Sequence, residues 1–240
     1  MELTQRLFLE DARLASMTAS VVTSGPEGVV LDRTVFYARS GGQPGDVGVL
    51  RWDGGEMPIV DTIKGEGERI LHLPAPGARL LAPGLAVAGD IDWDRRNRLM
   101  RAHTAMHLLS ALLRGAAVTG GAVGTERSRL DFDLPNPPPK EEIEAALNAL
   151  IAANYTVRAE WADESVLDAD PGLVRTLSVK PPRGAGRIRL VRIGSDDPPV
   201  DLQPCGGTHV SATAEIGPVR VLKIENKGKQ NRRIVIASAE

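Results

Sequence analysis

Short apolar segments separated by glycine, proline and aspartate run through the first 90 or so residues of the chain. Segments of this length, bounded by turn residues, are typical of β-strands, and several in succession favour a small barrel or sandwich. His72 lies within one of them, where we expect it to be a packing or surface residue and not a metal ligand. The expected strands are Ala19–Thr23, Gly28–Leu31, Gly48–Trp52, Pro58–Ile63 and Ile70–Leu73.

Residues 94–114 contain neither glycine nor proline and carry apolar side chains at helical spacing, which predicts a helix. Asp94 is the expected N-cap of this helix. A second helix is expected at 140–153. Strands are expected at 129–134, 156–161, 186–193, 217–225 and 232–237. This alternation predicts an α+β fold with a β-barrel domain at residues 1–92 and an α+β domain at residues 93–240.

The composition is that of an ordinary globular protein, with 42% hydrophobic and 25% charged residues in 240. The single cysteine argues against disulfides and fits a reducing compartment, so we expect a cytoplasmic location. No apolar stretch approaches the length of a membrane span. Aromatic residues make up only 3%, which disfavours a broad base-stacking surface.

Net charge is -2, yet basic residues are concentrated in two places. Such runs are ordinarily solvated faces, but they also suggest contacts with nucleic-acid phosphates. The two runs are Arg95, Arg96, Arg98 and Arg101, and then Arg220, Lys223, Lys227, Lys229, Arg232 and Arg233, the latter opposed along the sequence by Glu225.

Two short blocks far apart in the chain carry most of the histidine and all of the cysteine. His103 and His107 are one helical turn apart, whereas Cys205 and His209 flank two glycines in an expected turn. Imidazole and thiolate are the ligands that Zn²⁺ prefers, and four of them complete a tetrahedral site. Thr104 stands where the H-E-x-x-H metalloproteases have their glutamate base. The sequence therefore predicts one zinc ion per chain and leaves open a structural or a catalytic role.

The segment 36–48 contains four glycines around Gln43. It lacks the sequence of a phosphate-binding P-loop and of a dinucleotide fingerprint. Glycines there can simply provide the backbone angles of a strand connection. A long amide between glycines can also meet a ligand, so both interpretations remain open.

Taken together, these segments closely resemble the alanyl-tRNA editing family, the free-standing relatives of the editing domain of alanyl-tRNA synthetase. The motifs follow the family's order and cover nearly the whole chain. They are L-D-x-T-x-F-Y at 31–37, S-G-G-Q-P-G-D at 40–46, H-x-x-x-H at 103–107, R-L-D-F-D at 129–133 and C-G-G-T-H at 205–209.

The resemblance implies a small β-barrel followed by an editing domain of the threonyl/alanyl-tRNA synthetase second-additional-domain type. It also implies hydrolysis of tRNA(Ala) mischarged with serine, or sometimes glycine, without an aminoacylation domain before residue 1. By position, the zinc ligands would be His103, His107, Cys205 and His209, and Gln43 with Gly41 and Gly42 would line the pocket. Met106 and the glycine-rich 120–124 segment depart from the family's usual residues.

Rejecting correct alanine requires a polar partner for the serine hydroxyl, and our candidates are Thr34, Gln43 and Thr208. No side-chain base is evident inside the zinc motifs. The expected partner is the acceptor end of tRNA(Ala), with no membrane association. We expect a monomer, since nothing resembles a coiled-coil dimerisation segment, although the sequence leaves the oligomeric state open. Two alternatives remain: a tRNA-binding module whose zinc is purely structural, and a zinc hydrolase of a small ester or amide.

Overall fold

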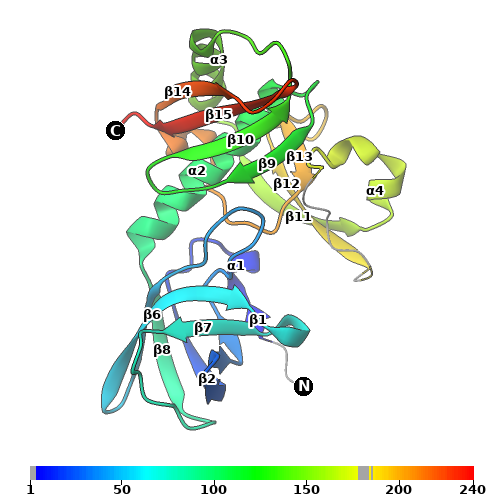
Figure 1. The fold of residues 1–240 in the computed structure, drawn as a ribbon. Coiled ribbons are helices and arrows are strands. Elements are labelled where there is room, and N and C mark those ends of the chain that lie inside the picture. The colour runs from blue at the N-terminus through cyan, green and yellow to red at the C-terminus, as the bar shows by residue number, and fades with distance from the viewer. Residues whose placement is uncertain (1–3, 178–183, 185) are drawn as a thin grey trace. The chain divides into compact units, whose positions relative to one another are not determined.

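The computed structural model describes residues 4–177, 184 and 186–240, and the chain divides into two compact units, 1–97 and 98–240 (Figure 1). Helix α2 (Trp93–Leu112) contributes its first residues to one unit and the rest to the other. None of the helices in the described part of the chain is both long and apolar enough to cross a membrane.

The first unit is built on a closed barrel of six antiparallel strands in the order β2-β3-β7-β6-β5-β8. Alternate residues of these strands point inward, as in β6, where Met57 and Ile59 are buried between exposed neighbours. Leu31, Phe36 and Leu50 complete the centre of this core. The elements are β1 (Gln5–Arg6), α1 (Leu7–Glu10), β2 (Ser16–Gly25), β3 (Gly28–Leu31), β4 (Arg33–Thr34), β5 (Gly48–Trp52), β6 (Gly55–Lys64), η1 (Glu66–Glu68), β7 (Ile70–Pro74) and β8 (Ala86–Ile91).

The five strands expected in this region are present, and the barrel is confirmed. The sequence did not indicate β1, β4 or α1, which are two to four residues long and too short to show a period. The N-cap expected at Asp94 is wrong. Asp92 caps α2, because its Oδ1 accepts the Arg95 backbone N–H at 2.9 Å, and Asp94 lies in the first turn.

A buried ion pair anchors the glycine-rich loop of the first unit. Asp46, at the end of this loop, accepts from Arg96 and from the Tyr37 backbone N–H, and both charged side chains are at most 1% exposed. Arg96 also donates to the carbonyls of Val35 and Ala12 at 2.7 and 2.8 Å. Gly45 allows the close approach, because a Cβ there would collide with the Thr62 carbonyl oxygen.

His72 is a second buried polar group in the barrel. Its Nδ1 donates to the Val29 carbonyl at 2.9 Å, so Nε2 accepts from the Thr34 hydroxyl at 2.7 Å. Thr34 Oγ1 also accepts the Phe36 N–H. The expectation that His72 is a packing residue agrees with this placement, and burial lowers its pKa to about 4.

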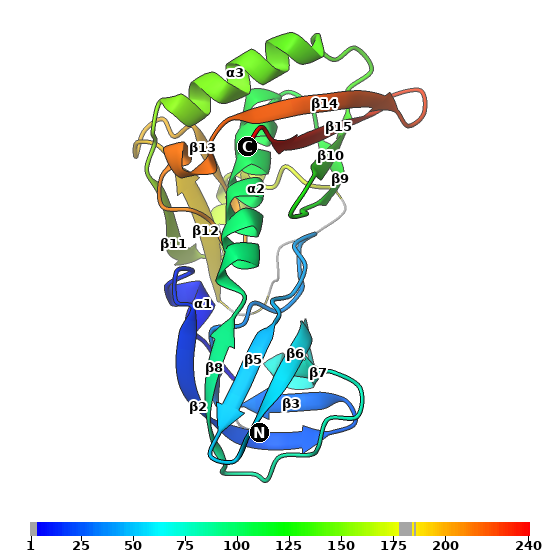
Figure 2. The same cartoon turned by 90° about the vertical axis from the view of Figure 1, so that its left-hand side faces the viewer.

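The second unit contains two antiparallel sheets, β14-β15-β10-β9 and β11-β12-β13. Figure 2 shows α2 running through this unit and α3 lying along β14. Asn148 of α3 both donates to and accepts from the backbone of Val219, which ties α3 to this strand. The elements are β9 (Val118–Ala122), β10 (Ser128–Asp133), α3 (Lys140–Ala152), β11 (Val157–Asp163), α4 (Val166–Ala169), η2 (Pro171–Leu173), β12 (Arg187–Ile193), β13 (Asp201–Pro204), η3 (Thr213–Ile216), β14 (Val219–Asn226) and β15 (Asn231–Ser238).

Helix α2 is more deeply buried than its apolar stripe indicates. All residues from 103 to 110 are buried, including His103, Thr104, His107 and Ser110. A helix enclosed on every side belongs to the interior of a domain. The polar residues of α2 between 103 and 110 therefore face other protein groups and not solvent.

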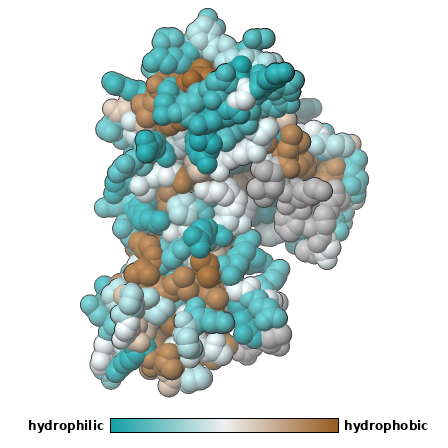
Figure 3. Space-filling view, in the orientation of Figure 1, coloured by the Kyte–Doolittle hydropathy of each residue, from teal (hydrophilic) through white to brown (hydrophobic). Residues whose placement is uncertain are grey.

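The basic runs are only partly available to a partner. Arg96 is fully buried, so the suggestion that it contacts phosphate is wrong. Arg233 forms two hydrogen bonds to Asp131, at 2.7 and 2.9 Å, so Glu225 is not the only acid opposing the second run. Arg220 and Lys229 are exposed, on a surface over β14 and β15 that is largely hydrophilic (Figure 3).

Asp46→Asn should lower the free energy of unfolding by about 3–5 kcal/mol, because Arg96 is left buried without its counter-charge. Urea unfolding of the two proteins measures this difference. The matched control is Asp90→Asn, which removes the partner of Arg51 in a pair that is 51% and 45% exposed and should cost less than about 1 kcal/mol. Equal losses in the two variants would contradict the anchoring role.

Because His72 is buried as a neutral imidazole, the free energy of unfolding should fall as the pH is lowered. The imidazole is neutral in the folded protein down to about pH 4 but takes up a proton near pH 6.5 when unfolded, so stability is lost as the pH falls between these values. From pH 7.5 to 5 the loss from this residue is about 2 kcal/mol. His72→Gln should show a correspondingly shallower decline in urea unfolding free energy, and parallel curves would contradict the assignment.

Candidate metal centre

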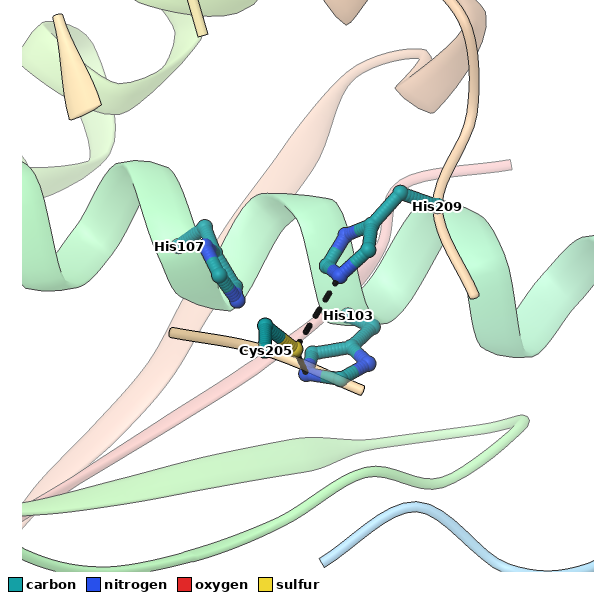
Figure 4. Close-up of side chains that lie close together, drawn as sticks. All are labelled: His103, His107, Cys205 and His209. Atoms are coloured by element: carbon teal, nitrogen blue, oxygen red, sulfur yellow. Dashed lines mark hydrogen bonds between the residues drawn. The ribbon is translucent and has the colours of Figure 1, made fainter. Parts of the chain in front are cut away.

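Four side chains from two segments of the second unit converge on one point (Figure 4). His103 and His107 come from α2, and Cys205 and His209 from the segment that follows β13. One potential ligand atom of each lies within 4.8 Å of the others. The structure therefore brings together the four residues that the sequence indicated as metal ligands.

The helix presents its two histidines one turn apart, with ring centroids separated by 5.2 Å. The His209 ring lies 4.4 Å from that of His103 and 4.6 Å from that of His107. The Cys205 Sγ is 3.4 Å from His209 Nε2 and 3.6 Å from His103 Nε2. The Nε2 atoms of His103 and His209 thus face the sulfur.

The segment 205–209 is held as an irregular turn, as expected from its glycines. Arg189 of β12 donates to the carbonyls of Cys205 and Gly207, at 2.7 and 3.1 Å. The Gly207 N–H points to the Cys205 sulfur at 3.3 Å. Backbone contacts on both sides therefore fix where the sulfur lies.

The outward nitrogens of two imidazoles are occupied by protein groups. His107 Nδ1 donates to Asp201 Oδ2 at 2.9 Å, and Asp201 is also bound by Gln203 and Arg175. The Thr104 hydroxyl donates to the Met100 carbonyl, so it accepts from His209 Nδ1 at 3.1 Å.

In the neutral form of each ring, these bonds leave Nε2 with its lone pair directed into the cluster. Hydrogen bonds of this kind set the tautomer and orientation of metal-bound histidines.

The protein's own electrostatics favour the thiolate. Burial raises the pKa of Cys205, but the neighbouring His103 and His209 lower it more, to well below its usual range. Burial lowers the pKa of His107, yet hydrogen bonds to Asp201 and Cys205 raise it overall to about 9. Burial and the charge of His103 lower the pKa of His209 to about 3. A borderline-soft cation binds thiolate and neutral imidazole, so its binding must displace the proton that His107 holds at neutral pH when no cation is present.

The donor set and its surroundings fit a metal ion such as Zn²⁺. Three nitrogens and one sulfur make up a four-coordinate set, and the outer hydrogen bonds orient the rings. Cys205 is only partly buried, whereas the three histidines are buried. Access to the centre is therefore from the side of the turn.

The remaining sequence-predicted site residues fall into two groups. Thr208 lies in the turn of the second unit and is fully buried. Thr34, Gly41, Gly42 and Gln43 belong to the first unit, where Gln43 is buried and both glycines have positive φ angles. The Thr34 hydroxyl is engaged with His72 and the Phe36 N–H, which favours a structural role for this residue.

Sequence reasoning missed Asp201, Thr104 and Arg189. Thr104 attracted notice only as a departure from the metalloprotease pattern, although it supports His209. Asp201 lies four residues before Cys205, a position that carries no signal until the strand register is known. Arg189 acts through backbone carbonyls, which sequence patterns do not reveal.

Comparison with known proteins gives matches to two family models. The threonyl and alanyl tRNA synthetase second additional domain matches residues 188–235, and the class II (A) tRNA synthetases match residues 8–95. The chain is 39% identical to an alanine–tRNA ligase of Pyrobaculum arsenaticum, over 92% of this chain but 25% of the ligase. It therefore spans about a quarter of the length of such ligases.

Other relatives match from end to end. The alanyl-tRNA editing protein AlaX-M of Methanosarcina mazei is 37% identical, covering 97% of this chain and 95% of the relative. The AlaX-M protein of Saccharolobus solfataricus is 35% identical, covering 97% and 98%. Similarity of this extent establishes kinship, and the chain belongs to the family of alanyl-tRNA editing proteins of the AlaX-M type.

Proposed function

We propose that this protein is a trans-editing deacylase that hydrolyses the ester between serine and tRNA(Ala). The observation that carries the proposal is the three-histidine, one-cysteine centre in a chain that matches alanyl-tRNA editing proteins over nearly its whole length. The proposed partner is the acceptor end of tRNA(Ala), met by a monomer in the cytoplasm. Glycine attached to the same tRNA is a second possible substrate.

One zinc ion per chain would be held by His103, His107, Cys205 and His209. When bound, such an ion polarises a carbonyl, acidifies water or orients an amine, and an open position is needed for the first two. Four protein ligands complete a tetrahedron, so the second candidate function is a tRNA-binding module in which the metal only stabilises the fold.

The surrounding residues position the centre. Asp201 accepts a hydrogen bond from the His107 ring and is bound by Gln203 and Arg175 as well. It therefore positions the ring and does not act as a general base. Thr104 does the same for His209. We assign no side-chain base, and water or a substrate hydroxyl would carry the proton.

Selection of serine over alanine requires a polar group that loses its partner when the hydroxyl is missing. Thr208 is the proposed residue in the turn itself. Gln43, with Gly41 and Gly42, is retained as substrate-binding on the strength of the family resemblance. Thr34 would have to exchange one of its bonds, to His72 or to the Phe36 N–H, for a bond to the serine hydroxyl.

Deacylation of Ser-tRNA(Ala) by metal-replete protein tests the proposal, with Gly-tRNA(Ala) and Ala-tRNA(Ala) as comparison substrates. Serine should be released far faster than alanine, and chelation should abolish the activity until zinc is restored. Cys205→Ala should behave like the chelated protein. A folded, zinc-loaded sample that binds tRNA but releases no amino acid would reject the deacylase in favour of the binding module.

Asp201→Asn should weaken zinc binding by about 10- to 100-fold, because the anionic acceptor that orients His107 is lost. Competition with a chromophoric chelator measures the affinity. Asp196→Asn is the control, since its carboxylate is 86% exposed and should leave the affinity unchanged. Thr104→Val, which removes the acceptor for His209, should also weaken binding. Unchanged affinity in folded Asp201→Asn and Thr104→Val would contradict the positioning role.

A further inference from the structure

One large aromatic side chain of the second unit is directed to solvent. Trp161 on β11 is 48% exposed, whereas Trp52 and Trp93 pack against the barrel core. Among the exposed large apolar side chains of the described residues, Trp161 is the one aromatic. Its position on the sheet shows what it lies beside.

The register of the three-stranded sheet aligns Trp161 across the strands with Arg189 and Cys205, one of the four residues of the metal centre. Trp161 lies opposite Arg189 on β12, and the Arg189 carbonyl accepts the Cys205 N–H at 3.2 Å. Since neighbouring strands are about 4.8 Å apart, Trp161 is roughly 10 Å from Cys205 along this row.

Trp161 also lies on the sheet face that looks toward the metal ligands. Arg189 and Ile193 share one face of β12, because they are separated by an even number of residues. Ile193 is paired with Asp201, and the Asp201 side chain bonds His107. The face that bears Trp161 is therefore the face that supports the metal centre.

A cation accompanies the indole. The Arg187 guanidinium carbon lies 5.7 Å from the centroid of the Trp161 ring, and Arg187 is exposed. Asp163, directly opposite Arg187, uses its carboxylate to accept the Ser165 N–H at 2.9 Å. The result is an exposed indole with a positive charge held over its ring.

We propose that Trp161 is a stacking platform for one unpaired base at the 3′ end of the aminoacylated RNA, with Arg187 positioned to contact its phosphate. This inference rests on the proposed function, which places the ester bond at the metal centre. An exposed ring on a residue whose backbone lies roughly 10 Å from that of Cys205 suits the base of the nucleotide that carries the ester, or of its neighbour.

The chemistry of the surface favours a nucleotide over an apolar peptide. Any base offers a π-face to an indole, and an adjacent guanidinium complements a phosphodiester. A purely apolar partner would leave the charge of Arg187 next to a dry interface, which is unfavourable. The low aromatic content still excludes a broad surface, and one ring is enough for one base.

Binding of uncharged tRNA(Ala) tests this proposal without relying on catalysis. The intact RNA and an RNA lacking its unpaired 3′ nucleotides are titrated against wild-type protein, Trp161→Ala and Trp161→Phe. Trp161→Ala should weaken binding of the intact RNA by roughly 5- to 150-fold and leave the truncated RNA unaffected. Trp161→Phe should retain most of the affinity.

Leu222→Ala is the control for removing an exposed apolar side chain, since Leu222 is 46% exposed on the other sheet. Zinc content and thermal unfolding verify that each variant is folded. Equal affinity of Trp161→Ala and wild type for intact RNA, or equal loss on both RNAs, would overturn the platform. Selective loss in a protein that releases no serine would support the platform and reject the deacylase.

Discussion

Packing of three buried imidazoles against a partly buried cysteine sulfur is the constraint on which the second unit depends. Each of these groups loses hydration, and groups packed within 4.8 Å need either a cation or protons to offset this cost. The surrounding structure prepares for a cation. Asp201 and Thr104 occupy outward nitrogens, so lone pairs face the centre.

The need to hold these groups explains several features of the fold. Helix α2 passes through the middle of the unit, so His103 and His107 are both buried and held on a rigid element. The three-stranded sheet supplies the second pair at the end of β13 and holds the turn through Arg189. The same sheet carries Trp161 on the face toward the centre, so one element serves both metal and proposed substrate.

The first unit has its own buried polar anchors. The pair formed by Asp46 and Arg96 fixes the end of the glycine-rich loop to the start of α2. The side chains of His72 and Thr34 form a hydrogen bond with each other inside the barrel. Such groups contribute little net stability when paired but are costly when one partner is missing, which makes the loop conformation specific.

Sequence patterns predicted the barrel strands, the two long helices and the four residues of the cluster, because periodicity and ligand chemistry act locally. They failed where tertiary contacts decide. β9 and β13 were missed, since glycines in one and a proline in the other resemble turns. Asp92 and not Asp94 caps α2, and Arg96 is buried although arginine is usually solvated.

The most direct test of the account is zinc K-edge X-ray absorption of protein loaded with one equivalent of Zn²⁺. The structure predicts first-shell scattering from three nitrogens at about 2.0–2.1 Å and one sulfur at about 2.3 Å. The sulfur contribution should vanish in Cys205→Ser. A spectrum without sulfur in the wild type, or one dominated by oxygen, would contradict the metal centre and the function proposed for it.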